Sequence, residues 1–333
     1  MLSKEQISEI MDQFGLTFSE IPKFIDSSHG DDDLRWNFIL DERYVLKVNS
    51  ARSMWEERLR EISRLIERYN SIGVYAPRLL PAEDGRLSRE YEVNGAACVC
   101  FVEEYAAYPV CGEDTPLDWN GVTEHLGCLA AKYTNVDLSE IHSMWTIIDL
   151  APLDTGVDEK QENADLLVKT LEKNGYPELS QQVRAYNERL RAVIARDFRE
   201  LPRCVYQGDL NSANVLHDNG KFAGLIDFNM AGTDVNINVF VNETNAFPEE
   251  GDFDRLTVPE LLTAMEREQK RKLEPILRHY TLNALEKRVM PYYNQIAELF
   301  QWPNVCAMRA WLREENRRDK CAALIRAIMD RPI

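Results

Sequence analysis

The sequence predicts an α+β protein with two unequal lobes. A small N-terminal lobe combines an antiparallel sheet with one main helix, and a larger C-terminal lobe is mostly helical. Short strand-like runs separated by tight turns dominate the first hundred residues, whereas helical periodicity dominates the remainder. A chain of 333 residues is also too long for one simple hydrophobic core. We place the lobes at residues 1–104 and 105–333.

The N-terminal lobe begins with a helix for which Ser3 is the expected cap. Three strands follow, at 24–25, 36–40 and 44–48, and a tight Asp41-Glu42 turn joins the last two. Apolar residues at helical spacing then predict a helix over 51–71, and the apolar run 97–102 predicts a further strand.

The C-terminal lobe is predicted to hold helices near 119–134, 159–174, 178–199, 258–300 (interrupted) and 306–329. One β-rich island lies among them. Its strands are expected at 205–207, 214–216 and 222–228, and the turn Asp218-Asn219-Gly220 predicts that the last two form a hairpin.

Charge and apolar patterning exclude several classes of protein. The formal net charge of −17 argues against a nucleic-acid binder and against attraction to anionic membranes. No apolar run approaches the roughly 20 residues of a membrane helix, and the N-terminus lacks the apolar core of a signal peptide. Seven scattered cysteines, without a CxxC pair, favour reduced thiols. We therefore expect a cytoplasmic protein, and the sequence carries no signal of its oligomeric state.

Three polar residues of the β-rich island form the most informative pattern. Asp209 and Asn214 are five residues apart on a loop, and Asp227 ends a strand thirteen residues later. The predicted hairpin would bring Asn214 and Asp227 close together. Amide and carboxylate oxygens are ligands suited to Mg²⁺, which often binds a few protein groups together with substrate phosphates. Asp209 would then orient an acceptor hydroxyl and receive its proton.

Phosphoryl transfer also needs a cation for the phosphates that are not transferred. Lys47 lies on the third predicted strand and is flanked by apolar residues. A charge in such a place needs a partner. The next helix offers Glu56, Glu57 and Glu61, of which Glu61 is preferred.

Together these residues resemble the aminoglycoside phosphotransferase/choline kinase family of protein-kinase-like phosphotransferases. That family carries a His-x-Asp-x-x-x-x-Asn loop, then an apolar strand ending in Ile-Asp-Phe or Ile-Asp-Trp, and a lysine on the third strand. The resemblance extends over roughly residues 20–240, including Pro77 and Gly232-Thr233-Asp234. It implies a bilobal protein-kinase-like fold.

The resemblance also implies site residues and cofactors. Its catalytic residues would be Asp209, Lys47 and Glu61. The nucleotide, ATP or alternatively GTP, would be bound by Lys47, Glu104, Ala106, Asn214 and Asp227, with Mg²⁺ held by Asn214 and Asp227.

The sequence departs from the family pattern in two places. Gln207 replaces the usual histidine, whose main role is to brace the loop by hydrogen bonds, so Gln can serve there. The turn expected to cover the phosphates contains Asp31-Asp32-Asp33, and Gly30 is the one glycine of residues 16–72. These departures motivate an alternative hypothesis: a nucleotide-binding pseudokinase that acts as a regulatory or interaction module.

The region from Phe222 to Asp254 contains seven carboxylates and no Lys or Arg. They are Asp227, Asp234, Glu243, Glu249, Glu250, Asp252 and Asp254. The run is interpreted either as a solvated acidic loop or as an acceptor pocket that attracts a cation. The leading hypothesis is an ATP-dependent kinase acting on a hydroxyl of a small amine-bearing molecule, which is aminoglycoside-like, choline-like or homoserine-like.

Overall fold

The computed structural model describes residues 2–28, 33–93, 95–112, 115–148 and 158–333. The chain forms two compact units, one of Met1–Leu117 with Asn211–Asn229 and the other of Asp118–Leu210 with Met230–Ile333. These units differ from the expected lobes because the segment after residue 104 and the hairpin after residue 211 belong to the first unit. The Cys111 N–H, for example, donates to the Val215 carbonyl (2.9 Å).

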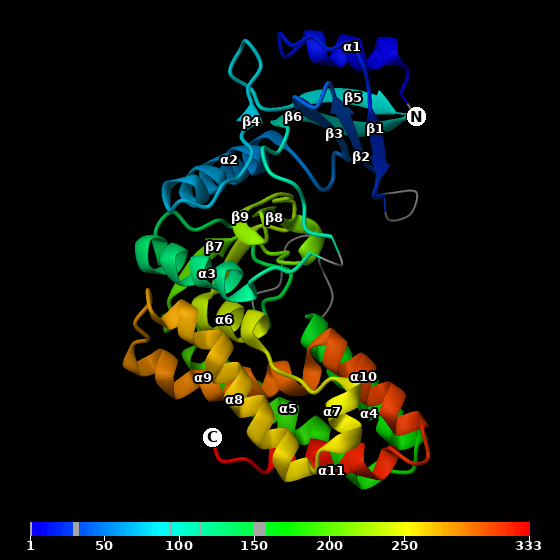
Figure 1. Ribbon diagram of the computed structural model, residues 1–333, viewed down its shortest axis with the longest axis vertical. Coiled ribbons are helices and arrows are strands. Elements are labelled where there is room, and N and C mark those ends of the chain that lie inside the picture. Colours follow the sequence, from blue (N-terminus) through cyan, green and yellow to red (C-terminus); the bar gives the residue numbers. More distant parts are fainter. Residues whose placement is uncertain (1, 29–32, 94, 113–114, 149–157) are drawn as a thin grey trace. The chain divides into compact units, whose positions relative to one another are not determined.

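The first unit is built on a six-stranded antiparallel sheet in the order β1-β2-β3-β6-β4, with β5 also paired to β6 (Figure 1). The strands are β1 (Lys23–Asp26), β2 (Arg35–Leu40), β3 (Tyr44–Ser50), β4 (Leu79–Leu80), β5 (Arg89–Val93) and β6 (Ala96–Glu104). The three predicted N-terminal strands and the later strand at 97–102 are confirmed. Strand β5 was not predicted from the sequence, because three of its five residues are charged and only Val93 is fully buried.

Helices α1 (Lys4–Asp12) and α2 (Glu56–Ser71) lie on opposite faces of this sheet (Figure 1). Ser3 caps α1 as predicted, because its side chain accepts a hydrogen bond from the Gln6 N–H. The buried face of α1 packs on alternate residues of β2, β3 and β6. The predicted start of α2 at residue 51 is wrong: residues 51–53 form a turn, in which the Ser53 N–H donates to the Ser50 carbonyl (3.0 Å).

The first unit also contains the predicted hairpin, preceded by a short 3₁₀ turn at Ser212–Asn214. Strands β8 (Val215–Asp218) and β9 (Lys221–Leu225) pair antiparallel. Asn219 and Gly220 join them with φ values of 51° and 80°, which are typical of a tight hairpin turn. Gly224 passes so close to the Tyr75 carbonyl that a Cβ there would lie 2.1 Å from the oxygen.

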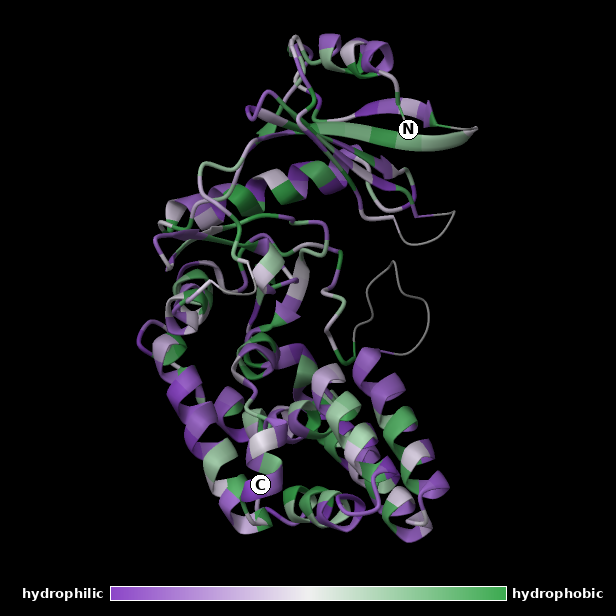
Figure 2. Ribbon diagram, turned by 45° about the vertical axis from the view of Figure 1, so that its right-hand side comes forward, coloured by the Kyte–Doolittle hydropathy of each residue, from purple (hydrophilic) through white to green (hydrophobic). Residues whose placement is uncertain are grey.

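The second unit is mostly helical around a two-stranded antiparallel sheet of β7 (Arg203–Tyr206) and β10 (Gly232–Val235). Its helices are α3 (Trp119–Tyr133), α4 (Glu159–Lys173), α5 (Pro177–Asp197), α6 (Asn236–Thr244), α7 (Glu250–Arg255), α8 (Val258–Leu277), α9 (Ala284–Phe300), α10 (Trp302–Arg313) and α11 (Arg318–Met329). Many of these helices show apolar residues on one side and polar residues on another (Figure 2). In the described residues, no helix combines the length and apolar character needed to cross a membrane.

Helix boundaries in this unit follow the sequence expectation except near the C-terminus. The single helix expected over 306–329 is two helices, α10 and α11, separated at residues 314–317. That segment is wholly polar, and its Arg317 pairs with Glu250 of α7 (2.6 Å) instead of continuing a helix. The short helices α6 and α7 were not predicted.

Candidate active site

Lys47 is buried in the first unit between two carboxylates. Its Nζ lies 3.2 Å from Glu103 Oε1 and 3.6 Å from Asp227 Oδ1, and its side chain is only 8 % exposed. Burial is the strongest influence on the pKa of Lys47 and lowers it, but the charges and hydrogen bonds of Glu103 and Asp227 together raise it above its usual value. Lys47 is therefore a fixed, buried cation.

The structure differs from the expectation for Glu61. Glu61 pairs with Arg58 one turn earlier on α2 (3.7 Å), and the carboxylate that flanks Lys47 together with Asp227 is Glu103. Glu56 accepts hydrogen bonds from the backbone of Leu87 and Ser88, so it holds the turn before β5. Glu103 was not predicted as a partner of Lys47, although strand alternation places it on the same face of β6 as Phe101, the residue opposite Lys47.

Glu61 remains connected to the region through Arg58. The buried Arg58 guanidinium donates to the Asn229 carbonyl (3.3 Å), two residues after Asp227. Burial lowers the pKa of Arg58, and the Glu61 charge opposes that effect. The Arg58–Glu61 pair thus attaches α2 to the segment that follows Asp227.

The hairpin brings Asn214 and Asp227 together, as predicted. The Ile226 N–H donates to the Asn214 carbonyl (2.9 Å), directly before Asp227. Asp227 has a φ of 56°, a left-handed conformation that is uncommon for residues other than glycine. Such backbone strain is concentrated at functional sites. The Asp227 side chain is 42 % exposed, so solvent reaches it despite its contact with Lys47.

Asn214 and Asp227 form a donor set that fits a divalent cation bound with phosphates. In the described residues, no group of three or more His, Cys, Asp or Glu side chains is gathered for metal binding. Magnesium sites of the phosphate-binding kind need only one or two carboxylates, because phosphates and water complete the coordination. The amide and carboxylate oxygens of Asn214 and Asp227 meet that requirement.

The nucleotide base is expected at the end of β6, where Glu104 is the last residue of the strand and Ala106 lies just beyond it. The Glu104 N–H donates to the Arg78 carbonyl (2.9 Å), and the Glu104 carboxylate accepts from the Arg78 N–H (3.1 Å). Within the described part of the chain, no backbone hydrogen bond uses the Ala106 N–H. Glu104 thus fixes the strand end, while the Ala106 amide can serve as a donor to a ligand.

Asp209 lies in the second unit, on a tightly held loop after β7. The Gln207 side chain accepts a hydrogen bond from the Asp209 N–H (2.8 Å), which is the bracing role expected for this residue. Gly208 has a φ of 84°, and a Cβ there would lie 2.3 Å from the Met230 carbonyl. The Trp145 indole donates to the Gly208 carbonyl. Only glycine fits this turn. The peptide group between Gly208 and Asp209 is held at both its carbonyl and its N–H, so the backbone of Asp209 is fixed in place.

Two further carboxylates of the acidic run lie in the second unit, Asp234 on β10 and Glu243 on α6. Burial raises the pKa of Glu243 on α6 to about 7; the charge of Lys160 opposes that shift and the charge of Asp209 adds to it. Burial also raises the pKa of Asp234 to about 6, although Asn238 and the Val235 N–H donate hydrogen bonds to its carboxylate. Asp234 anchors the start of α6, whereas Glu243 adds a second carboxyl group near Asp209.

Three of the remaining carboxylates pair with arginines, two of them with an arginine more than sixty residues away and one with an arginine three residues further along the chain. Glu250 pairs with Arg317 (2.6 Å), which also contacts Asp254, and Asp252 pairs with Arg255 (2.6 Å). The apparent lack of cations in this stretch of sequence therefore does not persist in the fold. These three carboxylates give no support to the cationic acceptor pocket.

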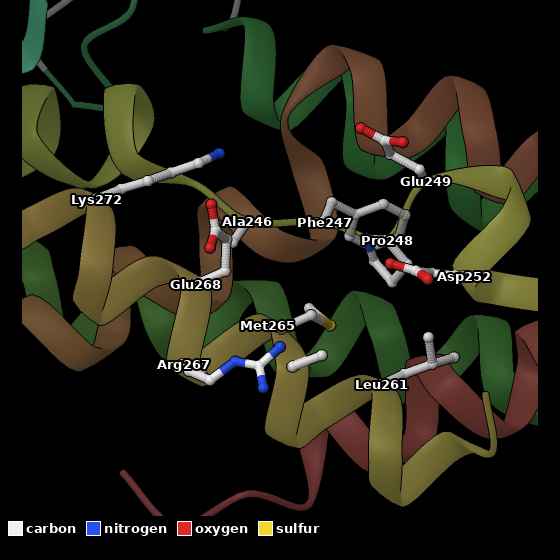
Figure 3. Close-up of a pocket in the computed structure, with 11 residues that line it drawn as sticks. Ala246, Phe247, Pro248, Glu249, Asp252, Leu261, Met265, Arg267, Glu268 and Lys272 are labelled. Atoms are coloured by element: carbon white, nitrogen blue, oxygen red, sulfur yellow. The ribbon is translucent and has the colours of Figure 1, made fainter. Parts of the chain in front are cut away.

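Glu249 and Asp252 line a separate pocket of about 310 Å³ in the second unit (Figure 3). The segment from Ala246 to Glu249 forms one side, and α8 forms the other with Leu261, Met265 and Lys272. The Lys272 ammonium donates to the Asn245 carbonyl (3.1 Å), and Glu268 on the same helix pairs with Arg271. Glu268 and Lys272 of this pocket are thus already bound by other groups of the chain.

Most of the turn expected to cover the phosphates, residues 29–32 with Gly30, Asp31 and Asp32, lies outside the described residues. Asp33 is described. Its buried carboxylate pairs with Arg35 at 2.8 Å, so this aspartate is neutralised by its own strand.

Two solved structures resemble this chain in fold. Among solved structures, the microcompartment-associated aminopropanol kinase matches with a TM-score of 0.53 and 13 % identity, covering 98 % of this chain and 95 % of that chain. A spectinomycin phosphotransferase in complex with ADP and spectinomycin matches with a TM-score of 0.51 and 10 % identity, covering 99 % and 95 %. Among curated proteins, none matches the sequence.

The fold is therefore that of the protein-kinase-like phosphotransferases, as the sequence predicted. The model of the phosphotransferase enzyme family (APH) matches residues 27–235, which is more than half of the chain. The chain belongs to this family.

Proposed function

We propose that this protein is an ATP-dependent kinase that phosphorylates a hydroxyl group of a small amine-bearing molecule. The observation that carries the proposal is the contact of Lys47 with Asp227, which the hairpin ties to Asn214. A buried cation beside an amide and a carboxylate suits a nucleotide's phosphates with their divalent metal. Membership of the family and the ADP in the spectinomycin phosphotransferase complex support nucleotide use.

The site residues have distinct proposed roles. Lys47 binds the phosphates that are not transferred, and Asn214 and Asp227 hold Mg²⁺. The ion, when bound, would neutralise charge on the β- and γ-phosphates. The Ala106 amide and the Glu104 strand end hold the base. Glu61 acts indirectly, through Arg58 and the Asn229 carbonyl.

In the proposed reaction the acceptor hydroxyl oxygen bonds to the γ-phosphorus while the bond from that phosphorus to the ADP oxygen breaks. Asp209 orients the hydroxyl and takes its proton. The products are ADP and a phosphate ester. Positioning and electrostatic stabilisation supply most of the rate enhancement in such reactions.

The amine-bearing acceptor is supported by Glu243, whose carboxyl group lies near enough to Asp209 for their charges to interact. An ionised Glu243 would attract a positively charged amine on the molecule whose hydroxyl meets Asp209. The names of two structural neighbours, an aminopropanol kinase and a spectinomycin phosphotransferase, are in keeping with such an acceptor.

A two-stage experiment tests the proposal. Thermal-shift measurements with ATP and GTP, each with and without Mg²⁺, should show stabilisation that requires the metal. Transfer of labelled γ-phosphate is then screened on amino alcohols, aminoglycosides, homoserine and matched alcohols without an amine. We expect transfer to at least one amine-bearing acceptor. Nucleotide binding without transfer to any of them would favour the pseudokinase alternative, and no nucleotide binding would contradict both.

A further inference from the structure

The register of the sheet explains why the Glu103 carboxylate flanks Lys47. Lys47 on β3 is paired with Phe101 on β6, so Glu103 is the diagonal neighbour two residues further along the same face. Glu103 is also paired with Leu79 of β4. Because neighbouring strands fix its backbone on both sides, Glu103 projects from a rigid place in the sheet.

The Lys47–Glu103 pair is well shielded from water. The two side chains are 8 % and 13 % exposed, and the Nζ–Oε1 distance of 3.2 Å is within hydrogen-bonding range. A buried ion pair holds its members strongly, because the removal of either one leaves an uncompensated charge. Asp227 is further away, at 3.6 Å, and is the more exposed carboxylate.

Two of the three carboxylates that α2 offered as partners of Lys47 have other partners. Glu61 pairs with Arg58, and Glu56 binds the backbone of Leu87 and Ser88 while also pairing with Arg60. Asp227 is a proposed metal ligand, so its negative charge would also interact with the metal ion. Glu103 pairs with Lys47 and is not a proposed metal ligand.

We propose that Glu103 is the positioning residue for Lys47, in the role that sequence reasoning gave to Glu61. Glu103 holds the ammonium group at a fixed place on the sheet, so that Lys47 meets the phosphates without first losing side-chain freedom. This inference rests on the proposed nucleotide-binding function. It adds a residue of β6 to the phosphate-binding apparatus.

The test compares Glu103→Gln, Glu103→Asp and the control Glu67→Gln, which changes an exposed carboxylate of α2, in the whole chain. ATP affinity is measured by calorimetry with Mg²⁺, and kcat/KM for ATP is measured with the acceptor found in the screen. We expect Glu103→Gln to lower kcat/KM and affinity at least tenfold and Glu103→Asp to recover most of the loss. Glu67→Gln should stay within about threefold of wild type.

A double-mutant cycle separates positioning from general stability. In a Lys47→Met background, Glu103→Gln should change ATP affinity less than twofold, because the group on which it acts is gone. Urea unfolding of each variant checks that it is folded. If Glu103→Gln stays within threefold of wild type, if Glu67→Gln is as damaging, or if Glu103→Gln costs as much without Lys47, the inference is overturned.

Wild-type protein is measured first. If it binds no nucleotide, the proposed function fails and this inference fails with it. If it binds nucleotide but no acceptor is found, the ATP affinities of wild type and the five variants still decide the role of Glu103.

Discussion

The Ile226 N–H donates a hydrogen bond to the Asn214 carbonyl at 2.9 Å, and this bond brings the two proposed metal ligands, Asn214 and Asp227, to the same end of one hairpin. The order of the chain does not provide this proximity, because thirteen residues separate them. A two-residue turn with positive φ at Asn219 and Gly220 makes it possible.

Asp227→Ala should abolish transfer and weaken the metal-dependent part of ATP binding, since it removes the only carboxylate of the Asn214–Asp227 pair.

Asp209→Asn should lower kcat by about a hundredfold to ten thousandfold, the range for loss of a general base. It should leave ATP affinity within about twofold. The two measurements are calorimetry with and without Mg²⁺, and steady-state transfer. Near-normal turnover of either purified variant would refute its assigned role.

Gly208→Ala should damage both stability and activity. The new Cβ would need a φ of 84° and would meet the Met230 carbonyl at 2.3 Å. We expect the free energy of unfolding to fall by about 1–3 kcal/mol and kcat to fall at least tenfold, because Asp209 is the next residue. Gly175→Ala is the control: its φ is 91°, but nothing lies within 4 Å of the added Cβ. Equal effects of the two substitutions on kcat would contradict this explanation.

Glu243→Gln should raise the KM of an amine-bearing acceptor about tenfold, with little change for an alcohol that lacks an amine. Because the pKa of Glu243 is raised to about 7, its carboxylate charge is gained as the pH rises through 7. Wild-type KM for the amine should therefore fall between pH 6 and 8, and the variant should lose this dependence. Glu250→Gln, whose carboxylate pairs with Arg317, is the control. An unchanged acceptor KM in Glu243→Gln would exclude Glu243 from acceptor binding.

Acid should destabilise the protein through His125 on α3. Burial lowers the pKa of His125 from 6.5 to about 4, so the folded state keeps this imidazole neutral. Below pH 6.5 the unfolded chain binds a proton that the folded chain does not. The stabilising contribution is thus complete above pH 6.5 and is lost as the pH falls towards 4, by about 3 kcal/mol in all.

Urea unfolding at pH 7 and pH 5 checks this prediction against His125→Gln. The comparison with the variant isolates His125 from buried carboxylates such as Asp234, whose raised pKa has the opposite effect. Wild type should lose about 2 kcal/mol more than the variant between these pH values. An equal loss in both proteins would contradict the role of His125.

The sequence by itself determined the fold class, the family and the order of the site residues. Local chemistry carried these predictions. Alternating apolar residues define β3, and the Asp218-Asn219-Gly220 turn defines the hairpin. The spacing from Asp209 to Asp227 identifies the loop that contains Asp209 and the strand that precedes Asp227.

Only the tertiary structure decided which charges meet. Glu103 contacts Lys47 because β3 and β6 are paired in a register that no local pattern specifies, while Glu61 pairs with Arg58 on its own helix. Arg317 neutralises Glu250 from more than sixty residues away, so an acidic stretch of sequence is not an acidic surface. The energy of a charge depends on its burial and its neighbours in space, and those are properties of the folded chain.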